Sequence, residues 1–270
     1  MVGFALLLPA YNEGPTIRAT LERLEGYFES AFPNVERELI VVDDGSVDDT
    51  VGQIEAYRRE SGSNLRLLMN PANLGLAAAL ETAAAATRMA VSIVVDADLS
   101  YAPETLGDLW LAINETRADC ALASPYSRGG AVRNVPFVRR AASVMANGLL
   151  SWCAGGRLKT LTGMVRAYRT RLLCDLLARR GVEEFNSWSV ADMLERGLQL
   201  VEVPAILAWP EHRANATRLD AGALWRRTAS VLRSAICLLA LREARFPALK
   251  GSPGTFVPHA IGERLISRRR

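Results

Sequence analysis

The sequence predicts an α/β protein whose central sheet is mostly parallel, with helices on both faces. Short, continuous apolar runs end at turn residues, and segments with the apolar spacing of a helix lie between them. The composition agrees, because half of the 270 residues are hydrophobic and 23% are charged, which excludes a disordered chain. No apolar run approaches the roughly 20 residues that a membrane-spanning helix needs.

The first half of the chain alternates most regularly. Buried strands are expected over residues 4–8, 38–42, 65–69, 91–95 and 120–124. Between these strands, one helix is expected over residues 16–28. A second is capped by Asp48 or Asp49 and continues through Tyr57. Two more are expected over residues 76–89 and 103–111.

The second half is less regular. A helix is expected over residues 137–153, a strand followed by a helix over 167–179, a helix over 189–196 and a strand over 200–203. Residues 224–242 form the pattern of an amphipathic helix with several arginines, and the tail after them is basic.

Charge is distributed unevenly along the chain. Residues 1–120 carry a net charge of −11 and residues 121–270 a net charge of +14, and 30 of the 32 basic residues are arginines. Arginine contacts phosphate oxygens in a bidentate way, so the second half is expected to meet an anionic partner. A GC-rich genome would also favour arginine, but it would not separate the charges.

The four cysteines have no C-x-x-C spacing and no histidine cluster beside them, which argues against a zinc or redox site. The amino terminus has no basic region typical of a signal peptide, so we expect a cytoplasmic protein. A peripheral contact with the inner face of a membrane, through the basic C-terminal part, is left open.

Acidic residues follow the predicted strands. Asp96 and Asp98 come directly after the strand at 91–95, and Asp43 and Asp44 after the strand at 38–42. Ligands of parallel sheets bind at the carboxyl ends of the strands. Two carboxylates separated by one residue can bind one hard divalent cation, which would bridge them to a diphosphate.

Four motifs in this order resemble the family 2 glycosyltransferases of the GT-A fold. They are L-L-P-A-Y-N-E (7–13), V-V-D-D-G-S (41–46), N-L-G (73–75) and V-D-A-D (95–98). Similarity continues through G-G (129–130), R-R (139–140), R-A-Y (166–168) and E-V-P (202–204). This longer match resembles the branch of dolichol-phosphate mannose synthase and other polyprenyl-phosphate glycosyltransferases, over about residues 4–218.

The resemblance implies roles for individual residues. Pro9, Ala10 and Tyr11 would line the nucleotide pocket, Glu13 would reach the ribose or base, Asp44 would accept a hydrogen bond from the base, and Asp43 would orient that turn. Asp96 would lie near the ribose and the metal–diphosphate unit, and Asp98 would be the principal ligand of Mg²⁺ or Mn²⁺. The resemblance also implies that Arg139, Arg213 and Arg218 contact phosphate.

The sequence departs from that branch at three positions. Ser100 stands where the branch has a metal-binding glutamine, Pro125 where it has a phosphate-binding arginine and Thr160 where it has an aspartate. The Ser100 hydroxyl can still ligate a metal, and Arg128 is close enough in sequence to replace the missing arginine. These departures leave the donor side intact and put the acceptor in question.

The expected function is metal-dependent transfer of a hexose or N-acetylhexosamine from a UDP- or GDP-sugar to a polyprenyl phosphate. The alternative acceptor is a soluble hydroxyl compound, such as a specialised-metabolite intermediate, which would need a general base. Asp192 is the first candidate for that base, with Glu184 and Glu195 as further ones. A non-catalytic nucleotide-sugar-binding protein is the alternative class. No nucleic-acid partner is expected.

The resemblance also implies a domain organisation. Residues 1–220 would form the GT-A catalytic domain, with a nucleotide-binding half over 1–124 and an acceptor-binding half over 125–220. An amphipathic helix and a basic tail would follow over 221–270.

Overall fold

The computed structural model describes residues 2–179, 185–209, 231–236 and 238–239, and it divides the chain into two compact units. The first unit contains residues 2–121 and 164–179 of this described part. The second unit contains residues 122–163, 185–209 and the described residues after 230.

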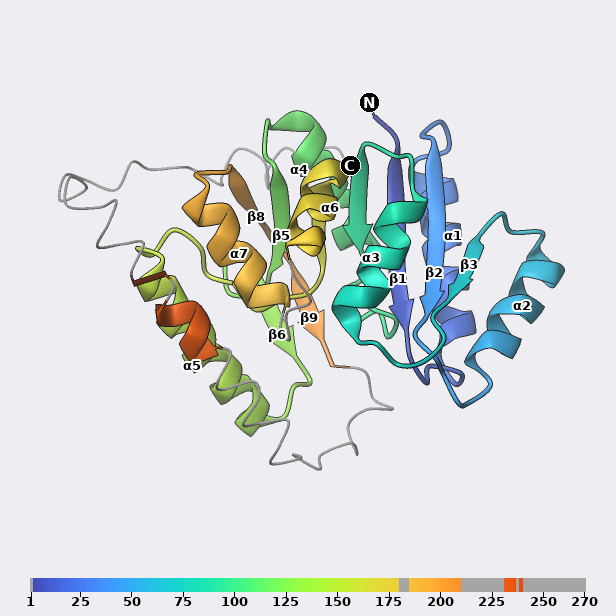
Figure 1. Ribbon diagram of the computed structural model, residues 1–270, viewed down its shortest axis with the longest axis horizontal. Helices are drawn as coiled ribbons and strands as arrows, with labels where there is room; N and C mark the ends of the chain where they lie inside the picture. Colours follow the sequence, from blue (N-terminus) through green and yellow to red (C-terminus); the bar gives the residue numbers. More distant parts are fainter. Residues whose placement is uncertain (1, 180–184, 210–230, 237, 240–270) are drawn as a thin grey trace. The chain divides into compact units, whose positions relative to one another are not determined.

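The first unit is a sheet with helices on both of its faces (Figure 1). Its strands are β1 (Phe4–Ala10), β2 (Arg37–Asp43), β3 (Arg66–Met69), β4 (Val91–Val94) and β7 (Arg166–Arg169), in the order β3-β2-β1-β4-β7. The first four are parallel, and β7 runs antiparallel to β4, so that Val94 pairs with Arg166. The predicted α/β class with a mostly parallel sheet is therefore confirmed.

Five helices cover this sheet: α1 (Ile17–Ala31), α2 (Thr50–Ser61), α3 (Leu76–Ala86), α4 (Pro103–Glu115) and α6 (Thr170–Ala178). In Figure 1, α3 lies in front of β1 and β2, and α1 lies behind them. The rings of Phe4, Phe28 and Trp110 join β1, α1 and α4, with centroids 5.0 Å (Phe4–Phe28) and 5.4 Å (Phe4–Trp110) apart. These rings are fully buried and form the core under this face.

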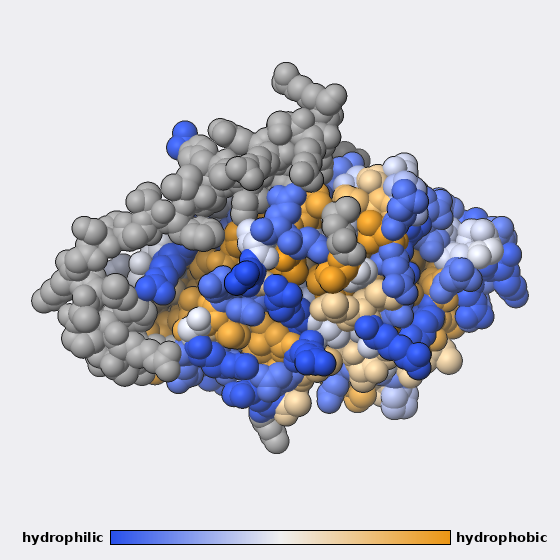
Figure 2. Space-filling view, turned by 90° about the horizontal axis from the view of Figure 1, so that it is seen from above, coloured by the Kyte–Doolittle hydropathy of each residue, from blue (hydrophilic) through white to orange (hydrophobic). Residues whose placement is uncertain are grey.

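The outer helix α2 shows why the apolar spacing predicted these elements. Its buried residues Thr50, Ile54 and Tyr57 lie on one face, and hydrophilic side chains cover the opposite surface at the right-hand end of Figure 2. Asp49 occupies the N-cap position but makes no capping hydrogen bond with its side chain. Asp48 does so instead, because its Oδ1 accepts the amide hydrogen of Thr50 at 3.0 Å.

The second unit contains β6 (Ala131–Arg133), α5 (Phe137–Cys153), α7 (Phe185–Glu195), β8 (Leu200–Pro204) and β9 (Ile206–Ala208). Strand β5 (Cys120–Ser124) begins in the first unit, ends in the second and lies beside β8, and β6 pairs in parallel with β9. Helix α5 has the bounds that the sequence predicted.

Several predicted helix boundaries were wrong. The helix expected over 16–28 covers Ile17–Ala31. The helix expected over 76–89 ends at Ala86, because Thr87 is extended and donates a hydrogen bond from its hydroxyl to Glu38. The helix expected over 103–111 continues to Glu115 and is followed by Thr116, whose hydroxyl bonds the carbonyl of Ala112. The helix expected over 189–196 begins at the buried Phe185.

The amphipathic helix expected over 224–242 lies largely outside the described residues. Residues 231–236 and 238–239 of it are helical. No helix in the described part of the chain is long and apolar enough to cross a bilayer.

Candidate functional site

The predicted donor-binding residues of the first unit lie at one edge of its sheet, where β2, β1 and β4 end side by side. Ala10 is the last residue of β1 and pairs with Asp43, the last residue of β2. Asp96 and Asp98 follow β4, and the amide of Val95 extends the pairing by donating to the carbonyl of Leu7 at 2.9 Å. The sheet therefore brings together segments that are up to about 90 residues apart in sequence.

The loops after β1 and β2 hold each other. The amide of Asn12 donates to Ser46 Oγ, and Asn12 Oδ1 accepts from the amide of Val47, both at 2.9 Å. The amide of Glu13 donates to Thr50 Oγ1 at 2.8 Å. Asn12 has φ 54°, a left-handed conformation that asparagine tolerates. These contacts give the P-A-Y-N-E segment a defined path, and Tyr11 is left 43% exposed at its surface.

Asp43 and Asp44 are both buried but have different surroundings. Asp44 accepts three hydrogen bonds: from Asn70 Nδ2 at 2.7 Å, from the amide of Leu74 at 3.1 Å and from the amide of Gly75 at 2.7 Å. Its carboxylate therefore ties the loop over residues 70–75 to the end of β2. The sequence pointed to a base contact for Asp44 and did not show this link to Asn70.

Asp43 uses one oxygen, Oδ2, to accept the amide hydrogen of Ser46 at 3.1 Å. Its other oxygen, Oδ1, is buried and accepts no hydrogen bond from any residue that the structure describes. A buried acceptor without a donor is costly. Asp43 therefore has the better-placed acceptor for a ligand at this edge, whereas Asp44 already holds the neighbouring loop.

The D-A-D segment is a tight turn around Ser100. The amide of Leu99 donates to the carbonyl of Asp96 at 3.0 Å, and Leu99 has φ 48°, which is strained for a residue with a β-carbon. This turn directs Ser100 back to the two carboxylates. Its hydroxyl donates to Asp96 Oδ2 at 2.7 Å, and its amide donates to Asp98 Oδ1 at 3.0 Å.

The donor set of this turn fits Mg²⁺ or Mn²⁺. Two half-buried carboxylates and one hydroxyl supply hard oxygen ligands. The described part of the chain contains no group of three His, Cys, Asp or Glu that could hold a metal by itself. Magnesium is commonly held by one or two carboxylates together with substrate phosphates, so a pair of this kind suits a metal shared with a diphosphate.

Thr20 contacts the turn, and Arg166 lies beside the end of the strand that precedes it. From α1, the hydroxyl of Thr20 donates to the carbonyl of Ala97 at 2.7 Å. From β7, Arg166 pairs with Val94 at the end of β4 and is only 1% exposed, and its Nη1 donates to Tyr168 Oη at 3.2 Å. Sequence reasoning assigned no role to Thr20 or Arg166. The contact of Thr20 depends on the packing of α1, and that of Arg166 on the pairing of β7 with β4, neither of which a local pattern reveals.

The predicted residues of the second unit have partners there. Arg139, in the first turn of α5, places its Cζ 4.9 Å from the centroid of the Trp209 ring, a cation–π contact. Asp192, in α7, forms an ion pair with Arg196 at 3.3 Å. Arg213, Arg218 and Glu184 lie outside the described residues.

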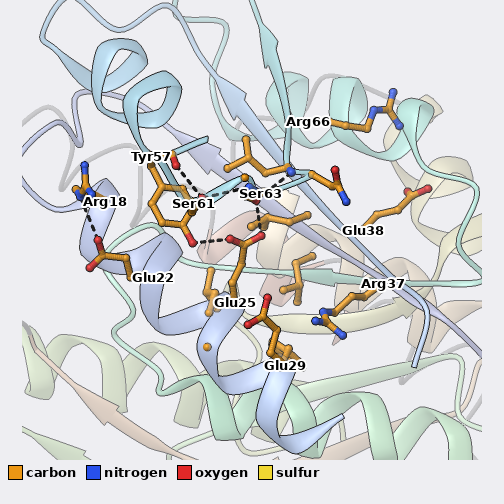
Figure 3. Close-up of a pocket in the computed structure, with 18 of the residues that line it drawn as sticks. Arg18, Glu22, Glu25, Glu29, Arg37, Glu38, Tyr57, Ser61, Ser63 and Arg66 are labelled. Atoms are coloured by element: carbon orange, nitrogen blue, oxygen red, sulfur yellow. Dashed lines mark hydrogen bonds and ion pairs between the residues drawn. The ribbon is translucent and has the colours of Figure 1, made fainter. Parts of the chain in front are cut away.

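A separate cavity of about 910 Å³ lies near the opposite ends of the strands of the first unit (Figure 3). It is lined by one side of α1 along most of its length, by the carboxyl-terminal part of α2 and the loop after it, and by the starts of β2 and β3. Inside it, Glu25 accepts hydrogen bonds from Tyr57 Oη and Ser63 Oγ, both at 2.5 Å. Burial, together with the Glu25 carboxylate, raises the pKa of Tyr57. None of the predicted donor-site residues lines this cavity.

Comparisons with known proteins show which family the chain belongs to. The family described as "Glycosyl transferase family 2" matches residues 5–176. The chain belongs to this family. It is a glycosyltransferase, and its motifs place it in the branch that the sequence indicated.

Curated relatives of this glycosyltransferase carry names of that branch. It is 32% identical over 206 residues to the polyprenol monophosphomannose synthase of Mycolicibacterium smegmatis, which covers 74% of this chain and 75% of that protein. It is also 32% identical over 139 residues to the dolichol-phosphate mannosyltransferase of Pyrococcus furiosus, with 52% of this chain and 38% of that protein covered.

Solved structures support the fold. Glucosyl-3-phosphoglycerate synthase of Mycobacterium tuberculosis, in complex with Mn²⁺, UDP and phosphoglyceric acid, matches with a TM-score of 0.64 at 20% identity. The match covers 87% of this chain and 78% of that one. At this identity the likeness shows the GT-A fold alone, which confirms the predicted fold class.

Proposed function

We propose that this glycosyltransferase transfers a hexose, with mannose as the first candidate, from a UDP- or GDP-sugar to a polyprenyl phosphate, with Mg²⁺ or Mn²⁺. The observation that carries the proposal is the pair of carboxylates at the end of β4, which Ser100 holds in one turn. The names of the relatives supply the mannosyl group and the lipid phosphate.

A divalent cation bound by Asp96 and Asp98 would supply charge neutralisation for the leaving nucleoside diphosphate. The residues of this chain orient the donor. Asp43 offers its buried Oδ1 to a hydrogen of the base, and Pro9, Ala10, Tyr11 and Glu13 form the wall beside it.

The ion pair of Asp192 supports a phosphate acceptor. A phosphate is already ionised near neutral pH and needs no strong base, whereas a hydroxyl acceptor must lose a proton in the transition state. The first candidate for that base, Asp192, is paired with Arg196, and its side chain is only 13% exposed. Arg139 can contact an acceptor or donor phosphate with the guanidinium that lies over Trp209.

A soluble hydroxyl acceptor is the second candidate. The observation that favours it is Pro125, which is buried and uncharged at the position where the branch has a phosphate-binding arginine. Under this alternative, Asp192 must leave Arg196 before it can act as a base.

The test has two steps. A thermal-shift screen with UDP- and GDP-sugars, with Mg²⁺ or Mn²⁺, identifies the donor, because a ligand at 100 times its Kd stabilises the folded state by about 2.7 kcal/mol. Transfer from that donor is then measured with a polyprenyl phosphate and with soluble acceptors.

We expect Asp98→Asn to abolish transfer and donor hydrolysis. The matched control is Asp175→Asn, a half-buried aspartate of α6 that is paired with Arg179. Equal activity of Asp98→Asn and the wild type would overturn the proposal, and transfer to soluble acceptors alone would select the second candidate.

A further inference from the structure

Asn70 contacts both acidic residues that follow β2. Its amide donates to the carbonyl oxygen of Asp43 at 2.8 Å, and its side-chain Nδ2 donates to Asp44 Oδ1 at 2.7 Å. Asn70 is only 9% exposed, so these hydrogen bonds lie in a region of low dielectric, where they are strengthened. The first residue after β3 therefore holds the main chain of Asp43 and the carboxylate of Asp44.

Thr82 of α3 holds the side-chain amide of Asn70 from the other side. Its hydroxyl donates to Asn70 Oδ1 at 3.0 Å. Thr82 is half-buried in the middle of α3, a helix that packs on β1 and β2 (Figure 1). An ionised carboxylate only accepts hydrogen bonds, so Asp44 and Thr82 agree on which way the amide of Asn70 faces. We call Thr82, Asn70 and Asp44 the relay.

The relay holds the loop after β3 on the turn after β2. Asp44 also accepts the amide hydrogens of Leu74 and Gly75, at 3.1 and 2.7 Å, so one carboxylate binds both ends of this loop. Between the two ends, the loop lies directly on Gly45, where a β-carbon would be 2.4 Å from the carbonyl carbon of Ala72. The loop and the turn are therefore packed as one piece.

The buried acceptor of Asp43 belongs to the same piece. The amide of Ser46 holds Asp43 Oδ2 at 3.1 Å, while Oδ1 is buried and bonds no residue that the structure describes. The carbonyl of Asp43 is held by Asn70. The position of Oδ1 therefore depends on Ser46 and on the relay together. A binding group contributes fully only when its neighbours fix it beforehand.

We propose that Asn70 and Thr82 are positioning residues for donor binding. Through Asp44 and the carbonyl of Asp43, they keep Asp43 Oδ1 in place to accept a hydrogen of the nucleotide base. The inference rests on the proposed function and deepens it, because it assigns part of the donor affinity to two residues outside the motifs of the donor edge.

A purely structural role for the relay makes a different prediction. Loss of a buried hydrogen bond that only stabilises the fold lowers the Tm and leaves the KM of the folded enzyme unchanged. Loss of positioning raises the KM for the donor instead. It leaves kcat nearly unchanged, because a contact with the base is made equally in the ground state and in the transition state.

Donor hydrolysis by the full-length protein with Mn²⁺ tests the inference, with GDP-mannose and UDP-glucose as donors and well below the Tm of every variant. Thr82→Val removes the hydroxyl and keeps the shape of the side chain, whereas Thr82→Ser keeps the hydroxyl. Asn70→Asp replaces the NH₂ group with an oxygen that faces Asp44. The control is Thr87→Val, which removes the threonine hydroxyl that bonds Glu38 near the start of β2.

We expect Thr82→Val to raise the KM for the donor about 3–10-fold, which corresponds to one neutral hydrogen bond. Asn70→Asp should raise it about 10–100-fold, because a bond to a charged group is replaced by repulsion. The kcat should stay within about twofold in both variants. Thr82→Ser and the control should keep the wild-type KM. Amide hydrogen exchange at Leu74 and Gly75, measured without donor, should be faster in Thr82→Val and Asn70→Asp only.

Two results would overturn the inference. One is a wild-type KM in Thr82→Val and Asn70→Asp, with only the Tm lowered, and the other is an equal rise of the KM in the control. If Asn70→Asp does not fold, Thr82→Val and Thr82→Ser decide. Asp98→Asn is measured in parallel. If it hydrolyses the donor as the wild type does, the proposed function fails and the inference with it; if it is inactive and Thr82→Val keeps the wild-type KM, the inference alone fails.

Discussion

Replacing Asp44 with asparagine should destabilise the protein, whereas the same change at Asp43 should weaken donor binding and leave stability nearly unchanged. The two residues are adjacent and both less than 5% exposed, so they form a matched pair. They differ in their partners, since Asp44 has three donors across its two oxygens and Asp43 has one.

The magnitude follows from these contacts. In Asp44→Asn, the remaining carbonyl oxygen can keep the bonds from Asn70 and Leu74, but the new amide NH₂ meets the N–H of Gly75, which lay 2.7 Å from Oδ2. One charge-assisted hydrogen bond is lost and a buried donor is left without an acceptor, which costs about 2–4 kcal/mol. For a unit of this size, that loss lowers the Tm by roughly 5–15 °C.

In Asp43→Asn, the carbonyl oxygen can keep the bond from the amide of Ser46, and the NH₂ replaces Oδ1, which bonds no described residue. We expect a Tm within about 3 °C of the wild type. We also expect the loss of most of the thermal shift that the donor produces, because an amide donor would face the hydrogen of the base.

Differential scanning calorimetry with and without the nucleotide sugar measures both effects. The reasoning is refuted if the two variants lose the same stability, or if Asp43→Asn retains the full donor-induced shift while Asp44→Asn loses it.

Three further changes test other contacts. Ser100→Ala removes the hydroxyl that donates to Asp96, so the metal concentration for half-maximal donor hydrolysis should rise about 10–100-fold; an unchanged midpoint would mean that the hydroxyl does not orient the ligand. Gly130→Ala places a β-carbon 2.4 Å from the carbonyl oxygen of Ser124, so urea unfolding should show a loss of about 1–3 kcal/mol, and a wild-type midpoint would contradict this. Burial opposes ionisation of Asp48, but hydrogen bonds from Thr50 and Gly14 lower its pKa. The ionised carboxylate therefore stabilises the fold above the unfolded pKa of about 3.9, and this stabilisation is lost as the pH falls through the lower folded pKa. Asp48→Asn should make the Tm depend less on pH between about pH 5 and 2, as measured by thermal unfolding.

Local patterns in the sequence were enough to predict most of the elements of the first unit. Apolar runs ended by Pro9, Asp43 and Asp96 predict strands because a buried strand excludes charge and a turn must follow it. Helix α5 has the predicted bounds, and both of its ends carry a local signal, since Pro136 precedes it and Gly155 and Gly156 follow closely.

Contacts between distant segments could not be predicted in the same way. The bond of Asp44 with Asn70 joins residues 26 positions apart and depends on the register of β2 with β3. The contact of Arg139 with Trp209 joins residues 70 positions apart. The return of Ser100 to Asp96 depends on a left-handed leucine, a conformation that residue statistics disfavour.

The network around Thr160 changes how its departure from the branch is understood. Thr160 is 3% exposed, its Oγ1 lies 2.7 Å from Ser124 Oγ, and Ser124 Oγ donates to Glu202 at 2.7 Å. The amides of Lys159 and Thr160 donate to the same carboxylate at 2.9 and 2.8 Å. A side chain enclosed in this way helps to hold the chain at residues 159 and 160 in place. The hydrogen bonds of Thr160 therefore give this departure a structural explanation. Of the departures on the acceptor side, only Pro125 still bears on the choice between a phosphate acceptor and a hydroxyl acceptor.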